Sequence, residues 1–158
     1  MRGVMNKNRY PFVPTKASEI EDGDFYFISL SNGRYACGRI LLIKRKSGRR
    51  TKTVLVGLHD WSGADHPTKE DIHECKIIEQ GVIHINSIGH VEGAIIGHKP
   101  LEEDNLKPLL QFEAGYLLDG FESIGKLPVE DYEKYSRRST YGLNVIRLLA
   151  EKHFVNNR

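Results

Sequence analysis

The chain has 158 residues, of which 39% are hydrophobic and 28% are charged. This composition lies near the average of globular domains and excludes an intrinsically disordered chain. The formal net charge of +2 excludes a protein whose whole surface attracts the phosphate backbone of nucleic acids. The length fits one domain. We expect an extended N-terminal arm over residues 1–18, followed by a single α+β domain over residues 19–158.

Membrane and secretory segments are not expected in this sequence. No apolar run approaches the roughly 18 residues that cross a bilayer, and no apolar stretch follows the basic residues near the N-terminus. The two cysteines, Cys37 and Cys75, lie in different segments, and we expect both to be buried free thiols. The sequence therefore favours a cytoplasmic protein without a membrane partner.

The first expected elements are two strands joined by a tight turn. Residues 25–31 and 34–43 are rich in aromatic and β-branched side chains. Asn32 and Gly33 separate them, and this dipeptide is the strongest short signal for a two-residue type I′ hairpin. We therefore predict an antiparallel hairpin that turns at these two residues.

The register of this hairpin fixes the neighbours of Arg39. A two-residue turn places Arg39 opposite Tyr26 and diagonal to Asp24. The guanidinium can then pair with the carboxylate of Asp24 and rest on the ring of Tyr26. We predict a structural role for Arg39; the alternative is that its side chain points into a partner's site.

A third strand is expected after a basic turn. Residues 44–52 contain six basic side chains around Ser47 and Gly48, and residues 53–58 are mostly β-branched or aliphatic. Three antiparallel strands result.

The middle of the chain gives weaker signals. Residues 59–68 read as a polar loop, while residues 75–78 and 82–88 are further strand candidates.

A helix is expected near the C-terminus. Thr140 can act as its N-cap, and Leu143, Ile146 and Leu149 follow at helical spacing. The whole pattern predicts an α+β fold: a mainly antiparallel sheet, strongly twisted or shaped as an SH3-like barrel, opened by the hairpin and covered by the C-terminal helix.

Two imidazoles and two carboxylates fall within the segment from His59 to His66, which includes Asp60 and Asp65. Such side chains can bind zinc or iron. The His-Glu-x-x-His and Cys-x-x-Cys spacings are missing, so we expect a solvated loop and neither a metal nor a cofactor.

The sequence favours neither catalysis nor nucleic-acid binding. The sequence has no Gly-x-Ser-x-Gly elbow, and Cys37 lies in an expected strand, so we expect no enzyme. The basic residues of segment 44–52 could grip a nucleic acid, but acids elsewhere balance them, so we expect no nucleic-acid partner.

Residues 21–41 resemble the opening hairpin of the immunity protein 26 family. The resemblance rests on a Gly-Asp pair, a tight glycine turn and a Tyr-x-x-Gly-Arg sequence. The matching residues are Gly23, Asp24, Gly33, Tyr35, Gly38 and Arg39. It implies a bacterial cytosolic protein of a polymorphic-toxin or contact-dependent growth inhibition system, which binds and blocks the toxin domain encoded beside it. It implies no catalytic residue.

Two segments are candidates for contact with such a toxin. The first is Trp61 with Asp60 and Asp65, because a rigid aromatic residue with polar neighbours suits an interface. The second is the acidic run Glu102, Glu103 and Asp104, since carboxylates steer association with basic partners.

Alternatives remain for the role of Trp61 and for the function of the whole chain. The ring of Trp61 can instead cover one end of the sheet. The chain as a whole can instead be a nucleic-acid-binding or regulatory module on a small β-barrel-like sheet.

Overall fold

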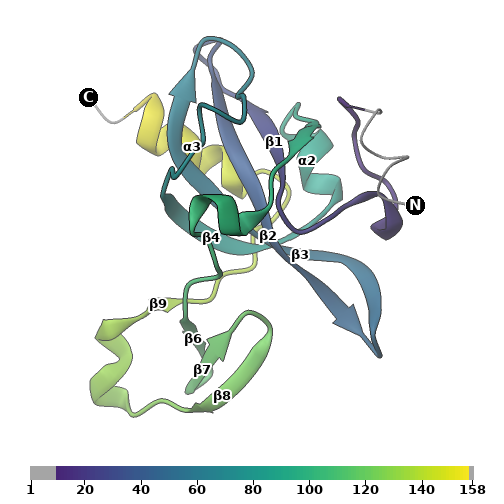
Figure 1. Cartoon of the computed structure of the whole chain (residues 1–158). Helices are drawn as coiled ribbons and strands as arrows, with labels where there is room; N and C mark the ends of the chain where they lie inside the picture. The colour runs from purple at the N-terminus through teal and green to yellow at the C-terminus, as the bar shows by residue number, and fades with distance from the viewer. Residues whose placement is uncertain (1–9, 157–158) are drawn as a thin grey trace.

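The structure is a computed structural model that describes residues 10–156 as two sheets and short helices (Figure 1). The larger sheet has five strands in the order β4-β3-β2-β1-β5, and the smaller has four in the order β8-β7-β6-β9. The predicted α+β class with mainly antiparallel pairing is confirmed. The larger sheet is open and does not close into a barrel.

The larger sheet contains β1 (Asp24–Ser29), β2 (Tyr35–Lys46), β3 (Arg49–Gly63), β4 (Ile77–His84) and β5 (Ile95–His98). The smaller sheet contains β6 (Gln111–Glu113), β7 (Tyr116–Asp119), β8 (Glu122–Lys126) and β9 (Ser136–Arg137). The α-helices are α2 (Asn86–His90) and α3 (Val145–Phe154), and the 3-10 turns are η1 (Ala17–Glu19), η2 (Leu101–Asp104) and η3 (Val129–Lys134).

The predicted hairpin between β1 and β2 is present, but its predicted register is wrong by one residue. Phe25 faces Arg39 and Tyr26 faces Gly38. The reason is the loop: the Leu30 amide donates to the Arg34 carbonyl over 2.9 Å, so three residues, 31–33, turn the chain instead of two. Gly33 alone in this loop has a positive φ, of 81°, whereas a type I′ turn needs positive φ at both central residues. The one-residue shift moves Arg39 to the face of the sheet opposite Tyr26.

The two-residue turn that joins two strands occurs instead between β2 and β3. Ser47 and Gly48 have φ values of 52° and 77°, and Lys46 pairs with Arg49 across the turn. The predicted basic turn and third strand are thus confirmed.

The predicted loop over residues 59–68 is wrong in its first part, because β3 continues to Gly63. A bulge at His59 keeps the strand paired with β4 while its direction changes. The predicted strand over 82–88 is also wrong at its end. The chain turns into α2 there, which buries both Ile85 and Ile88 on one side of a helical turn.

The C-terminal helix is confirmed, but it begins at Val145 rather than after Thr140. Thr140 forms an isolated parallel bridge with Val82, and the Tyr141 amide donates to the Val82 carbonyl over 2.7 Å. The chain is therefore held against β4 at the position where the helix was expected to start.

The main hydrophobic core lies on one face of the larger sheet. Tyr26, Ile28 and Ile40 contribute to it from β1 and β2, and Ile88 and Ile146 from α2 and α3. The packing of the C-terminal helix on the sheet follows from this cluster. A second, smaller cluster occupies the opposite face.

Residues 1–9 of the predicted N-terminal arm lie outside the described residues. Phe12 exchanges two backbone hydrogen bonds with Ile95 of β5, at 3.0 and 2.8 Å. The rings of Tyr10 and Phe12 stack on each other and pack against the main core. This part of the arm therefore lies on the domain.

The smaller sheet stands apart from the larger one in Figure 1, and a network of buried polar side chains joins the two. The Gln80 amide of β4 donates to Gln111 of β6 over 2.8 Å, and its oxygen accepts the Leu109 amide. Arg138 donates to the same Gln111 oxygen and to the Gly120 carbonyl. These contacts fix the smaller sheet at the edge of β4.

Variants at the close contact between Tyr26 and Gly38 test the observed register. A Cβ atom at position 38 would overlap the Tyr26 ring, so we expect Gly38→Ala to lower the free energy of unfolding by about 2 kcal/mol. Tyr26→Leu removes the overlapping ring, so the double variant should be more stable than the summed single effects by about 1 kcal/mol. Urea denaturation measures all three variants. Additive losses would contradict the observed pairing.

Candidate functional site

Arg39 is a fully buried charged residue at the centre of the second face of the larger sheet. Its Nε donates to the Gly23 carbonyl over 2.9 Å, and an Nη atom donates to the Lys99 carbonyl over 2.6 Å. Its other Nη atom pairs with an Asp104 carboxylate oxygen at 3.0 Å. The predicted pair with Asp24 is wrong, because the register shift places Arg39 beside the 99–104 segment. The predicted structural role of Arg39 fits this geometry.

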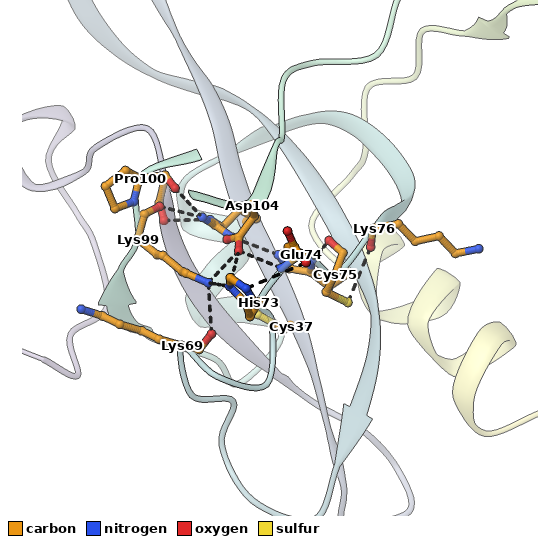
Figure 2. Close-up of polar contacts among 12 residues, drawn as sticks. Cys37, Lys69, His73, Glu74, Cys75, Lys76, Lys99, Pro100 and Asp104 are labelled. Atoms are coloured by element: carbon orange, nitrogen blue, oxygen red, sulfur yellow. Dashed lines mark hydrogen bonds and ion pairs between the residues drawn. The ribbon is translucent and has the colours of Figure 1, made fainter. Parts of the chain in front are cut away.

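Asp104 completes this cluster, and its carboxylate is fully buried. It accepts the Lys99 ammonium at 2.6 Å and the Glu74 amide at 2.8 Å, as Figure 2 shows. Burial by itself raises the pKa of Asp104, but hydrogen bonds from Lys99, Glu74 and Arg39 outweigh it and hold the pKa below its usual range. The expectation that Asp104 belongs to an exposed acidic run is therefore wrong. The charges of Lys99 and Arg39 and the Glu74 amide compensate the burial of the Asp104 carboxylate.

His59 forms the third side of the cluster and is also fully buried. Its Nδ1 lies 3.0 Å from the Cys75 carbonyl, and its Nε2 lies 3.3 Å from an Nη atom of Arg39. The carbonyl can only accept, so Nδ1 carries the proton and Nε2 accepts from the guanidinium. Burial, and then the charge of Arg39, lower the pKa of His59 to about 4. His59 is therefore a neutral structural residue and not part of a solvated loop.

Beside this cluster lies a cleft of about 800 Å³. Its lining residues come from the N-terminal segment, β1, the loop after β3, and β5: Tyr10, Glu19, Glu21, Asp24, Phe25, Pro67, Thr68, Lys69, Ile96, Gly97, His98 and Pro100. At its inner end, Nδ1 of His98 donates to Asp24 over 2.8 Å, and the Glu21 amide donates to the other Asp24 oxygen over 2.9 Å. Burial raises the pKa of Asp24, and these two hydrogen bonds oppose the rise.

Next to the cleft is an aromatic surface, formed by Phe27, Tyr35, Trp61 and His66. His66 stacks on Phe27 with ring centroids 3.9 Å apart and meets the edge of Tyr35 at 4.6 Å. Trp61 lies in β3, half-buried against the second cluster, and its ring covers Gly63.

The sequence-predicted partner residues fall in two places. Asp60 and Asp65 are exposed and lie on either side of Trp61 in the chain. Asp60 directly precedes Trp61 on β3, so its side chain leaves the strand on the opposite face, and its carboxylate lies 4.0 Å from the Lys76 ammonium. Glu102 and Glu103 are exposed on η2, which follows directly after Pro100 of the cleft. The cleft itself was not predicted, because its lining comes from segments up to ninety residues apart that share no spacing pattern.

The cysteines belong to the same region. Cys37 is buried in the second cluster, as expected, whereas Cys75 is only half-buried against it. Burial raises the pKa of both thiols, so neither is an activated nucleophile.

Membrane-spanning helices and clustered metal ligands are both missing from the described residues. Between residues 10 and 156, no helix combines the length and the apolar character that crossing a bilayer requires. Over the same described part of the chain, no three His, Cys, Asp or Glu side chains gather in a group that could hold a metal ion.

These features define a small α+β protein with an open sheet, a cleft and an aromatic surface on one face. A sequence profile of the family described as immunity protein 26 matches residues 21–119. The chain therefore belongs to the immunity protein 26 family, as the hairpin motif implied. The match runs from the start of the larger sheet through β7 of the smaller one. No curated protein and no solved structure matches the chain.

The buried cluster predicts a large difference between two neighbouring acids. Asp104→Ala leaves Arg39 and Lys99 without a buried carboxylate, so we expect the free energy of unfolding to fall by about 3 kcal/mol or more. Glu103→Ala, on the same turn but exposed, is the matched control and should change it by less than about 0.5 kcal/mol. Urea denaturation measures both. Equal effects would mean that the buried ion pair does not stabilise the fold.

The lowered pKa of His59 predicts a pH dependence of stability. In the unfolded chain His59 takes up a proton near its ordinary pKa of 6.5, whereas the folded chain holds it neutral down to about 4. The contribution of neutral His59 is therefore complete above pH 6.5 and is lost as the pH falls toward 4. Between pH 7 and pH 5 the loss should be about 2 kcal/mol.

The matching variant is His59→Gln, which cannot titrate. Its unfolding free energy should decline less than that of the original chain between pH 7 and pH 5, by about 2 kcal/mol. Urea denaturation at the two pH values provides the comparison. Parallel declines in the two proteins would show that His59 is protonated equally in the folded and unfolded states.

Proposed function

We propose that this chain is an immunity protein that binds and neutralises a bacterial toxin domain encoded beside it, in the cytoplasm of the producing cell. The single observation that carries this proposal is the family match over residues 21–119. Neutralisation by direct binding requires a rigid surface with anchoring side chains and no catalytic residue.

The contact surface that we propose is the aromatic surface together with the exposed acids near it. Interfaces concentrate their binding energy in aromatic anchors surrounded by polar residues. Trp61 is half-buried and supported from below by the second cluster, so little side-chain freedom is lost when a partner covers it. Asp65, directly before His66 in the chain, provides a polar edge, and Asp60, Glu102 and Glu103 add negative charge that would steer a basic partner.

Binding is favoured over catalysis because the polar groups in the interior of this region are occupied. Arg39, Asp104 and His59 hydrogen-bond or pair with one another and with backbone carbonyls. Oδ2 of Asp104 has no hydrogen bond of good geometry and is compensated only by the ion pair with Arg39. Buried groups that are paired in this way stabilise the fold. We therefore propose no enzymatic activity and no cofactor.

The alternative function is a nucleic-acid-binding module, and one observation favours it. The basic residues of segment 44–52 lie at the β2–β3 turn, which projects beyond the rest of the larger sheet in Figure 1. We prefer a protein partner, because the chain carries 21 acidic against 23 basic residues and such a balance gives little salt-dependent affinity for phosphate backbones.

The proposed contact surface is tested with the toxin domain encoded by the neighbouring gene. We expect Trp61→Ala to weaken binding by about 2 kcal/mol, which is roughly a thirty-fold higher Kd, while circular dichroism shows an intact fold. Leu148→Ala, at a 58%-exposed position on α3, is the control and should leave the Kd unchanged. Isothermal titration calorimetry measures both, and growth of cells that express the toxin shows whether protection follows affinity.

A second variant covers the case in which Trp61→Ala unfolds the protein. Asp65→Lys changes an exposed side chain, so the fold should survive. It should slow association at low salt. If both variants fold and bind the toxin as the original chain does, the contact surface lies elsewhere.

A further inference from the structure

We propose that the cleft receives a cationic side chain, an arginine or a lysine, of the protein that this chain neutralises. This inference rests on the proposed function and assigns a binding role to the cleft, which the family match does not describe.

The shape and lining of the cleft suit a long side chain with an apolar stem and a charged end. Its walls include the rings of Tyr10 and Phe25 and the apolar side chains of Pro67 and Ile96. Arginine and lysine bury their methylene stems along apolar surfaces while the charged end contacts polar groups. Aromatic rings also attract cations that lie over their faces.

The charged groups around the cleft are mainly carboxylates. Glu19 is held in place because its Oε1 accepts the amides of Thr15 and Lys16 at 2.8 and 2.9 Å. Glu21 keeps 43% of its side chain exposed and lies 3.7 Å from Arg50, which is also partly exposed. Asp24 lies deeper and is bound by His98. Among the lining residues that the structure describes, these three carboxylates outnumber the lysines, of which there is one, Lys69.

The behaviour of Tyr10 supports a negative potential in the cleft. Burial raises the pKa of Tyr10 to about 12, and the charges of Asp24 and Glu21 add to the rise. A field that disfavours a phenolate at this position favours a cation at the same position.

The cleft also continues into the proposed contact surface. His66 of the aromatic surface is followed directly by Pro67 of the cleft. Phe25 and Phe27, two residues apart on β1, belong to the cleft and to the aromatic surface respectively. One partner can therefore cover the aromatic surface and insert a side chain into the cleft.

The test uses a defined probe, Nα-acetyl-arginine methylamide, and follows backbone amide signals of the intact chain by NMR. We expect saturable shifts at Phe25, Thr68, Gly97 and His98. The uncharged analogue Nα-acetyl-norleucine methylamide and the anionic Nα-acetyl-glutamate methylamide should cause none. Shifts that do not saturate, or that are equal for the three probes, would overturn the proposal.

Two charge variants separate a cation site from an anion site. Glu21→Gln should raise the Kd of the arginine probe about three-fold, whereas Lys69→Gln should lower this Kd by a similar factor. Glu122→Gln, on the fully exposed strand β8, is the matched control and should have no effect. The opposite pattern at Glu21 and Lys69 would show an anion site and contradict the proposal.

A final experiment measures binding of the toxin domain itself. Glu21→Lys should raise its Kd at least ten-fold, and an unchanged Kd would exclude the cleft from the interface even if the toxin is neutralised. If the original chain binds the arginine probe but not the toxin, the proposed function and the partner assignment are contradicted, while the cation site stands.

Discussion

The buried pair between Arg39 and Asp104 is the interaction on which the rest of this region depends. A buried arginine that loses its carboxylate is strongly destabilising, so the two side chains must be brought together whenever the chain folds. Arg39 comes from the middle of β2, and Asp104 comes from η2, more than sixty residues later. The same guanidinium also binds the carbonyls of Gly23 and Lys99. One side chain thus holds the start of β1 and the segment after β5 against the sheet, and with them two walls of the cleft.

The hairpin register decides whether this pair can form. With the two-residue turn that Asn32 and Gly33 predict, Arg39 would share a face with Tyr26 and lie in the main core. The three-residue loop shifts the pairing by one position, and because side chains alternate along a strand, the shift turns Arg39 to the other face. Gly38 then faces Tyr26, where only a residue without a Cβ atom leaves room for the ring.

Local patterns predicted the elements that local forces determine. The β1–β2 hairpin, the turn at Ser47 and Gly48, the third strand and the C-terminal helix all followed from neighbouring residues. The start of α3 did not, because Thr140 is held by a bridge to β4. The smaller sheet was also missed, since it is fixed by side-chain contacts such as Gln80 with Gln111, which no spacing reveals.

The candidate site likewise has features that the sequence predicts and one that it does not. The exposure of Asp60, Asp65, Glu102 and Glu103 could be predicted from the sequence because each lies in a polar segment. The burial of Asp104 could not, because it depends on a distant arginine and on Lys99.

The motif that carries the family resemblance occupies the frame of the fold rather than its surface. Gly23 has a φ of 100° and packs against the Lys99 carbonyl, Gly33 closes the hairpin loop, and Gly38 admits the Tyr26 ring. Arg39 forms the buried pair. Of the matched residues, Tyr35 lies in the aromatic surface. Asp24, also one of the matched residues, lines the cleft.

We propose that this frame presents the aromatic surface and the cleft to a toxin. This is tested by hydrogen–deuterium exchange of the chain, alone and in complex with the toxin domain that we propose as its partner. We expect slower exchange on binding in residues 61–69 and 96–103, with no change in β8 and α3. Protection confined to β8, α3 or the β2–β3 turn, with residues 61–69 and 96–103 unchanged, would contradict it.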